Sequence, residues 1–263
     1  MKARLHVVTG KGGVGKTVIS LALCHALKSQ HKKVLYLNIQ DMPDKRIFSD
    51  LGVGSWDINT LDSAKLYIAK KLGSQTIAEW ILKTPFFKSL FHMLPSLGHL
   101  IILGHIIDRL EKEPDLHLVF DSPSSGHVLG LFESTSNYRS IFKSGLIVED
   151  INRMEKFLSG EDNVLIHIIS LPTQMACQEG AELQTELDSR LKAPIQTVFN
   201  DCYSRCPELV GELEHLPPAL AKKIELEKEI LADSQDQKIP HYSTLEMSET
   251  ATLISAEIAS LYE

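Results

Sequence analysis

The sequence predicts an α/β fold: a mostly parallel sheet with helices on both faces and helical insertions. Short continuous apolar runs, such as residues 34–39 and 164–169, alternate with longer segments whose apolar residues recur at helical spacing. Strands without polar alternation are typical of parallel sheets that are covered on both faces. A chain of 263 residues, 43% of them hydrophobic, can bury a sizeable core, and α/β folds of this length are commonly one domain. We therefore expect a single domain over residues 1–263.

A glycine-rich loop follows the first apolar run, residues 5–8, and precedes an apolar helical segment. It reads G-K-G-G-V-G-K-T over residues 10–17 and fits the phosphate-binding pattern G-x-x-x-x-G-K-[ST]. Glycines let backbone N–H groups turn inward around phosphate oxygens, and Lys16 would neutralise the outer phosphates. Thr17 would begin the helix and complete the coordination of Mg²⁺. The loop predicts a nucleoside triphosphate rather than a plain turn, and the expected binding residues are Gly12, Gly13, Val14, Gly15, Lys16, Thr17 and Val18.

The early lysine, Lys11, gives this loop the form K-G-G-V-G-K-T. In this form it resembles the deviant Walker A motif of the arsenite-transport ATPases, the tail-anchored-protein targeting ATPases and the MinD and ParA partitioning ATPases. The resemblance implies a P-loop NTPase fold that binds and hydrolyses ATP with Mg²⁺. It also implies a homodimer in which Lys11 reaches the partner's nucleotide. Val18 departs from the pattern, because relatives usually place a second Thr or Ser there.

The second strand, residues 33–39, precedes the segment where the resembling family carries a catalytic aspartate. That aspartate positions the attacking water. Aligned without a gap, Gln40 occupies its place, a slip of one residue puts Asp41 there, and Asp44 is a third choice. We take Asp41 as the catalytic candidate. The alternative is that Asp41 is only a turn residue before Met42-Pro43.

Two segments have helical rather than strand periodicity, at approximately residues 55–113 and 129–158. The first contains a stretch rich in large apolar residues, 85–94, which ordinary packing between helices would explain. In relatives of the targeting class, helices inserted here form a groove for an apolar transmembrane segment. The resemblance therefore also implies an apolar protein client.

A further apolar run, residues 116–120, is followed by Asp121-Ser122-Pro123-Ser124-Ser125-Gly126-His127. Ligands of open α/β sheets bind at this end of the strands. The segment is similar to the D-T-A-P-T-G-H switch of the arsenite and targeting ATPases. The similarity implies that Asp121 contacts Mg²⁺ through water and that Gly126 lets the backbone approach the terminal phosphate. The alternative is that Asp121 caps a turn and that Ser122-Pro123 merely ends the strand.

The last part of the chain carries the expected base-binding residues. Asn200 ends the expected strand 195–200 and resembles the V-x-N element that reads adenine, and Pro240 resembles the loop that covers adenine. An Asn at a strand end is also common turn chemistry. Cys202 and Cys206 follow with C-x-x-x-C spacing, whereas the targeting ATPases hold zinc at the dimer interface with C-x-x-C. Two thiolates per subunit complete a tetrahedral site only across a twofold axis, so we expect reduced thiols and no zinc.

Charge and hydropathy bear on the partners and the compartment. The net charge of −7 gives no reason to expect direct binding of nucleic acid. No window of about 18 uninterrupted apolar residues occurs and no leader is visible, so we expect no membrane span and a cytoplasmic protein. Two alternatives stay open: a MinD- or ParA-like positioning ATPase, and an interaction module that binds nucleotide without hydrolysing it. Gln40 and Val18 favour the second alternative.

Overall fold

The sheet is entirely parallel. The computed structural model describes residues 3–40, 42–123, 125–141, 144–160, 162–244 and 246–259. Within them, seven strands form one sheet in the order β3-β2-β4-β1-β5-β6-β7, and every neighbouring pair is parallel. This confirms the predicted α/β fold. The strands are β1 (Leu5–Thr9), β2 (Lys33–Asn38), β3 (Gly54–Asp57), β4 (Leu116–Asp121), β5 (Val164–Ser170), β6 (Ile195–Cys202) and β7 (Gln237–Pro240).

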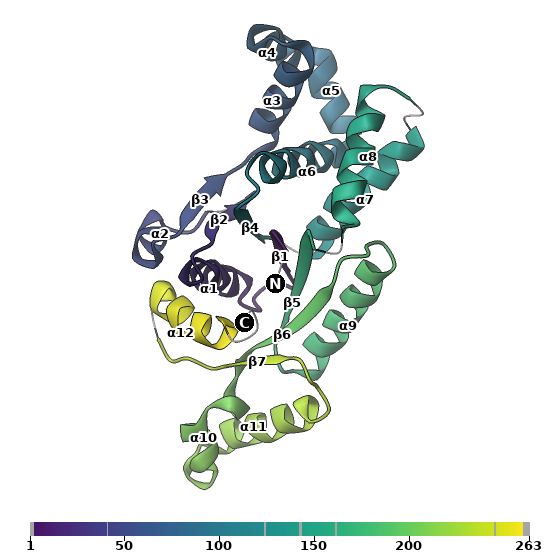
Figure 1. Ribbon diagram of the computed structural model, residues 1–263. Helices are drawn as coiled ribbons and strands as arrows, with labels where there is room; N and C mark the ends of the chain where they lie inside the picture. The colour runs from purple at the N-terminus through teal and green to yellow at the C-terminus, as the bar shows by residue number, and fades with distance from the viewer. Residues whose placement is uncertain are drawn as a thin grey trace.

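Helices cover both faces of the sheet, as Figure 1 shows. Alternate residues of the central strand β1 point to opposite cores. Leu5 and Val7 belong to the core under α6 to α9, and Val8 belongs to the core under α1, α2 and α12. The helices are α1 (Lys16–Ser29), α2 (Lys45–Leu51), α3 (Thr60–Leu72), α4 (Gln75–Lys83), α5 (Pro85–Met93), α6 (Pro95–Lys112), α7 (Ser125–Ile141), α8 (Leu146–Leu158), α9 (Gln174–Asp188), α10 (Pro207–Gly211), α11 (Pro218–Leu231) and α12 (Met247–Ala259).

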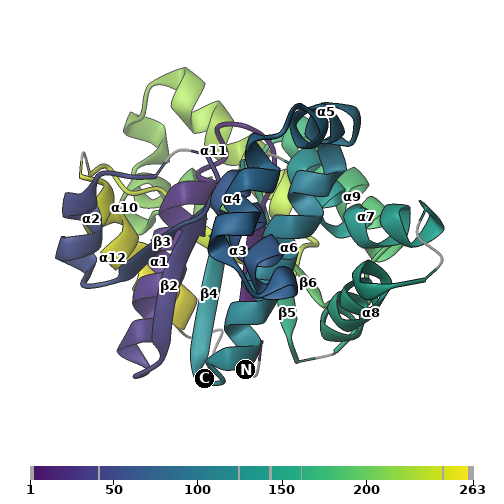
Figure 2. The ribbon, with the colours of Figure 1, turned by 90° about the horizontal axis from the view of Figure 1, so that it is seen from above.

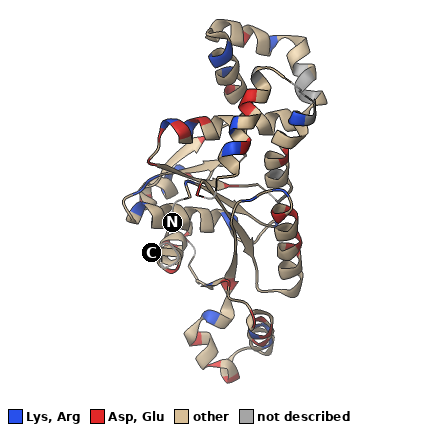
Figure 3. Ribbon diagram, turned by 45° about the vertical axis from the view of Figure 1, so that its right-hand side comes forward, with Lys and Arg blue, Asp and Glu red and all other residues tan. Residues whose placement is uncertain are grey.

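The helical insertions form an additional layer outside the sheet. Helix α6 packs on the sheet through one face, where Leu103, Ile106 and Ile107 are fully buried. Helices α3 to α5 lie on the side of α6 that faces away from the sheet (Figures 1 and 2). We call α3 to α8 the helical layer. Charged residues lie mainly on the helices, whereas the strands of the sheet carry few (Figure 3).

One boundary expected from the sequence is wrong. Residues 55–57, placed in the first helical insertion, belong to strand β3. This strand pairs with β2 through Leu37↔Trp56 and Asn38↔Asp57 at the edge of the sheet. It is short and mostly exposed, so its sequence carries no strand periodicity, and the ladder to β2 alone makes it a strand. In the second insertion the chain is helical, in α7 and α8, with Gly145 at the start of α8.

No helix in the described ranges is both long enough and apolar enough to span a membrane.

Candidate nucleotide-binding site

The glycine-rich loop joins β1 to α1 at the carboxyl edge of the sheet. Gly10, Gly13 and Gly15 have φ angles of 144°, 80° and 90°, a region that residues with a side chain rarely adopt. A Cβ at Gly10 would lie 2.3 Å from the Ile169 carbonyl oxygen, and one at Gly15 would lie 2.2 Å from Asn200 Nδ2. A Cβ at Gly12 or Gly13 would meet open space. The loop is therefore clamped at both ends by close packing, and its middle is open to solvent.

Lys16 folds back over this loop. Its Nζ donates a hydrogen bond to the Lys11 carbonyl oxygen at 2.9 Å, and the residue is only 9% exposed. Burial lowers the pKa of Lys16, and the nearby Asp121 carboxylate offsets part of this effect. A buried ammonium group among backbone N–H groups suits the binding of phosphate oxygens.

Asp121, at the end of β4, is the centre of a buried polar cluster. Its Oδ2 accepts hydrogen bonds from Thr17 Oγ1 at 2.7 Å, from the Tyr36 hydroxyl at 2.6 Å and from Asn38 Nδ2 at 3.3 Å. Its Oδ1 is buried and accepts none from the described residues. Burial raises the pKa of Asp121, although these hydrogen bonds and Lys16 oppose the rise. The predicted pair of Thr17 and Asp121 thus lies together, below the loop.

The donor set around Asp121 fits Mg²⁺. This ion prefers oxygen ligands and is usually bound through one or two carboxylates plus substrate phosphates and waters. Asp121 Oδ1 and the Thr17 hydroxyl offer such oxygens beside the phosphate-binding loop. No group of three or more His, Cys, Asp or Glu side chains able to hold a metal occurs in the described part of the chain, so the remaining ligands would have to come from the nucleotide and water.

Tyr36 and Asn38 of β2 belong to this cluster, and the sequence did not single them out. Both are buried, at 0% and 8% exposure. Burial and the charge of Asp121 raise the pKa of the Tyr36 hydroxyl, which therefore stays a hydrogen-bond donor. The available signal was their position: two polar-tipped residues near the end of an otherwise apolar strand, at the ligand-binding edge of a parallel sheet.

Asn200 lies beside the loop. Its Nδ2 donates to the Val14 carbonyl oxygen at 3.0 Å, so the amide braces the phosphate-binding loop. Pro240 is at the end of the neighbouring strand β7, where it pairs with Cys202. Both residues predicted to contact adenine are therefore on adjacent strands, and the contact itself stays a prediction.

Comparison with known proteins decides the family. Residues 5–164, more than half of the chain, match the CobQ/CobB/MinD/ParA nucleotide-binding domain. The chain belongs to this family. This confirms the resemblance seen in the loop, and the matched range contains the loop, β2 and Asp121.

Relatives named as ATPases are distant. The chain is 26% identical over 228 residues to the ATPase BagA of Mycobacterium tuberculosis, an alignment that covers 74% of this chain and 64% of BagA. It is 25% identical over 220 residues to a protein of Aquifex aeolicus described as a candidate arsenical pump-driving ATPase, covering 76% of this chain and 68% of that protein. The chain thus spans just under two thirds of the length of the mycobacterial relative.

Lys11, the early lysine of the glycine-rich loop, makes an ion pair with Glu179. Its Nζ lies 3.4 Å from Glu179 Oε1 on α9, and its side chain is 52% exposed. Lys11 and Lys16 therefore occupy different environments, one exposed and one buried. The action of Lys11 on a partner's nucleotide stays a prediction.

The three residues considered for positioning water are placed differently. Asp41, the catalytic candidate, lies outside the described residues. The Gln40 backbone N–H donates to Asn38 Oδ1 at 2.8 Å, and the exposed Gln40 follows the end of β2. Asp44 is the N-cap of α2 and accepts from the Arg46 N–H at 2.9 Å. Asp44 therefore already has a structural role.

Gly126 and Val18 complete the expected contact residues. Gly126 is exposed in the first turn of α7, and a Cβ there would meet open space. Val18 is half-buried and packs against the core under α1, α2 and α12.

Cys202 and Cys206 are free thiols. Burial raises the pKa of Cys202 to about 12, and it also raises the pKa of Cys206. The two Sγ atoms donate to backbone carbonyl oxygens, Cys202 to Phe199 and Cys206 to His241. Protonated thiols are poor zinc ligands, since the thiolate is the form that binds metal. The expectation of no zinc stays a prediction.

Proposed function

We propose that this protein is a Mg²⁺-dependent ATPase that hydrolyses ATP as a homodimer. The observation that carries the proposal is the hydrogen bond of Thr17 Oγ1 to Asp121 Oδ2 at 2.7 Å, next to a buried carboxylate oxygen without a partner among the described residues. Burying this charged cluster below the glycine-rich loop lowers the stability of the protein, because a buried charged group loses its hydration. Cation binding at this place would recover that cost.

Each residue of the cluster has a role in the proposed reaction. The loop N–H groups and Lys16 bind the phosphates, and Thr17 and Asp121 would hold Mg²⁺. When bound, Mg²⁺ supplies positive charge that stabilises the transferring phosphoryl group. Tyr36 and Asn38 orient Asp121 through their hydrogen bonds to Oδ2. Lys11 of each subunit delivers a second cation to the nucleotide of its partner.

Asp41 is the residue we propose to orient the attacking water. Asp44 is already used as a helix cap, and Gln40 has no carboxylate. If neither Asp41 nor Gln40 serves, the protein is a nucleotide-binding module without hydrolysis. The valine at position 18 favours this second function, because it cannot donate a hydrogen bond to an inner phosphate.

The test compares two lysines of one loop. Cations supplied in trans can raise phosphoryl transfer by about 10³- to 10⁵-fold, so Lys11→Ala should nearly abolish phosphate release and leave most of the ATP affinity. Lys16→Ala should weaken ATP binding itself. Lys32→Ala, an exposed lysine after α1, is the matched control and should change neither.

Turnover, ATP affinity and sedimentation with Mg²⁺ are measured for all three variants. Wild-type turnover and ATP-dependent dimerisation in Lys11→Ala would refute the trans mechanism. Tight ATP binding without any phosphate release by the wild-type protein would identify the nucleotide-binding module instead.

We also propose that the helical layer binds an apolar protein client. Large apolar side chains are exposed on the outer helices, with Trp80 at 69% and Phe86 at 75%. Exposed apolar groups that lie close together mark interaction sites more often than scattered ones do. The set on α3 to α5 is Leu61, Leu66, Leu72, Ile77, Trp80, Phe86 and Met93. Hydrogen exchange with and without ATP should change in these helices, and identical exchange throughout them would count against coupling.

A further inference from the structure

The helical layer encloses a cavity of about 620 Å³. It is lined mainly by α3, α6 and α8, with contributions from α5, α7 and Trp56 of β3. On α6 its lining includes Leu97, Ile101 and Gly104. The fully buried residues Leu103, Ile106 and Ile107 of the same helix are not among its lining residues and pack in the sheet core. Leu100, Tyr138 and Met154 belong both to that core and to the cavity lining, so the cavity borders the core. No residue of the glycine-rich loop or of the Asp121 cluster lines it.

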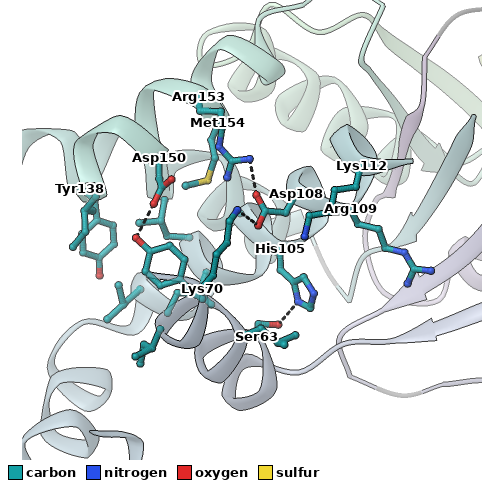
Figure 4. A pocket seen from close by; sticks show the side chains of 18 of the residues that line it. Ser63, Lys70, His105, Asp108, Arg109, Lys112, Tyr138, Asp150, Arg153 and Met154 are labelled. Carbon is teal, nitrogen blue, oxygen red and sulfur yellow. Dashed lines mark hydrogen bonds and ion pairs between the residues drawn. The ribbon is translucent and has the colours of Figure 1, made fainter. Parts of the chain in front are cut away.

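The lining changes from apolar to charged along α6. Leu97, Ile101 and Gly104 are followed by Asp108 and Lys112 on the lining face of the helix. At 1.5 Å per residue, Leu97 and Lys112 are about 22 Å apart along the axis. In Figure 4, Lys70, Asp108 and Arg153 lie between Tyr138 on one side and Arg109 and Lys112 on the other. The cavity therefore has one apolar end and one polar end.

Most charged groups that line the cavity neutralise one another. Asp108 is 2.7 Å from Lys70 Nζ and 2.6 Å from Arg153. Asp150, which lies on the Tyr138 side in Figure 4, pairs with Lys71 at 2.7 Å and accepts from the Tyr67 hydroxyl at 2.8 Å.

Lys112 lines the cavity at its exposed end. Lys112 makes no ion pair within the part of the chain that the structure describes, whereas its neighbour Arg109 pairs with Glu113 at 3.1 Å. The lining carries four cationic side chains and three acidic ones: Lys70, Arg109, Lys112 and Arg153 against Asp108, Glu113 and Asp150. The positive charge of Lys112 favours an anionic group at this end.

The volume limits what the cavity can hold. Pockets for small ligands measure about 300–1,000 Å³. The cavity volume therefore falls within the range of pockets that bind one small molecule.

We propose that this cavity binds one long-chain fatty carboxylate. Its chain lies along α6 against Leu97, Ile101 and Gly104, and its carboxylate is at the end formed by Arg109 and Lys112. The site is additional to the nucleotide site, and its occupation does not depend on the proposed ATP hydrolysis. Gly104 lines the cavity opposite Met154, so a side chain much larger than a methyl group at this position would reduce the space for the chain.

The first experiment fills the cavity. A Cβ at Gly104 would lie 3.5 Å from Met154 Sδ, which is ordinary van der Waals contact, so Gly104→Ala should fold and bind as the wild type does. Gly104→Leu extends the side chain further, by a Cγ and two Cδ atoms, and should weaken palmitate binding at least tenfold. Palmitate, below its micelle concentration, is titrated calorimetrically into the nucleotide-free full chain. Circular dichroism and thermal unfolding verify that both variants are folded, and Ile101→Trp replaces Gly104→Leu if that variant does not fold.

The second experiment tests the head group. Palmitate should bind at least fivefold more tightly than hexadecylamine or methyl palmitate, and Lys112→Gln should remove most of that preference. Lys32→Gln, an exposed lysine outside the cavity, is the control for the loss of one charge and should leave the preference unchanged.

Three results would overturn the proposal. The first is palmitate affinity unchanged in both cavity-filling variants, and the second is hexadecylamine bound as tightly as palmitate. The third is no palmitate binding together with binding of an apolar helical peptide that Gly104→Leu weakens, which would assign the cavity to a protein partner. Phosphate release is not a readout here, so a failed ATPase assay leaves these outcomes unaffected.

Discussion

The glycine-rich loop and the Asp121 cluster lie at the carboxyl edge of the sheet, which we call the nucleotide edge. This edge and the helical layer depart from the usual distribution of side chains in opposite ways. At the nucleotide edge, polar groups are buried: Lys16, Asp121 and Asn200 are 9%, 2% and 8% exposed. In the helical layer, Trp80 and Phe86 are exposed by more than two thirds of their surface. Charged groups are almost never fully buried without a partner, and large exposed apolar groups are informative only where they gather.

The two regions also differ in how their charges are compensated. In the helical layer, Asp108 is paired with two cations at a partly exposed place. At the nucleotide edge, the carboxylate of Asp121 accepts hydrogen bonds only from neutral hydroxyl and amide groups, with Lys16 nearby, and its Oδ1 has no hydrogen-bond partner among the described residues. A buried carboxylate oxygen without a hydrogen-bond partner therefore indicates a site for a charged ligand. Ion-paired side chains beside an apolar surface indicate instead a site for a partner or ligand that is mostly apolar.

The largest expected effect is at Asp121. Asp121→Asn should lower phosphate release at least about 10²-fold, because charge supplied by a metal is worth several kcal/mol in the transition state. The free energy of unfolding without nucleotide should stay within about 1 kcal/mol of the wild-type value or rise, since a buried charge is removed. Steady-state turnover and urea unfolding are compared with Asp115→Asn, an exposed control near the start of the same strand. Unchanged turnover would remove Asp121 from the proposed mechanism.

In the helical layer, the effect of a substitution on stability should depend on how deeply the side chain is buried. Leu103→Ala, at a fully buried position, should cost about 2–5 kcal/mol in the free energy of unfolding. Trp80→Ala should change it by no more than about 0.5 kcal/mol, because an exposed side chain gains little on folding. Urea unfolding measures both. A loss above 2 kcal/mol in Trp80→Ala would mean that the exposed helices are held by contacts that the present structure does not contain.

Three buried histidines should make the stability of the protein depend on pH. His6, His117 and His167 stack on adjacent strands, with ring centroids 6.1 Å apart for His6 and His117 and 5.6 Å apart for His6 and His167. Burial lowers the pKa of all three, and that of His167 to about 4 from an ordinary 6.5. The unfolded chain therefore binds protons that the folded chain does not. Stability is fully present above pH 6.5 and is lost as pH falls toward 4.

From His167 alone, this loss is about 2 kcal/mol at pH 5 relative to pH 8. Asp121, whose pKa is raised, acts in the opposite sense, so the informative quantity is the difference between variants. His167→Leu should flatten the dependence of unfolding free energy on pH, and His215→Leu, an exposed control, should not. Parallel pH profiles for wild type and His167→Leu would contradict the prediction.

The smallest expected effect concerns the ion pair of Lys11 with Glu179. A partly exposed pair is worth about 0.2–1 kcal/mol, so Glu179→Gln should increase ATP-dependent dimerisation about two- to fivefold by releasing Lys11 for the partner subunit. Added salt should reduce the difference. Analytical ultracentrifugation measures the ATP-dependent dimerisation of Glu179→Gln and of Glu182→Gln, a control on the same helix. Equal dimerisation of the two variants would mean that Glu179 does not restrain Lys11.

The sequence by itself predicted the parallel sheet and the phosphate-binding loop. Both follow from local chemistry. Strands that are apolar on both faces require cover on both faces, and glycines at Gly10, Gly13 and Gly15 permit the φ angles that the loop needs. Asp121 was found for the same reason, because it directly follows a buried strand within a contiguous motif. These features depend on neighbours in the chain, and a sequence shows such neighbours directly.

Only the tertiary structure decided which distant residues meet. Tyr36 and Asn38 reach Asp121 because β2 lies beside β4, and Asn200 reaches Val14 across 186 positions of sequence. The exposed strand β3 exists only through its ladder to β2. The cavity of the helical layer likewise arises from the packing of α3, α6 and α8. Hydrogen bonds and cavities are set by distances between elements, and these distances depend on strand order and helix packing rather than on any local pattern of residues.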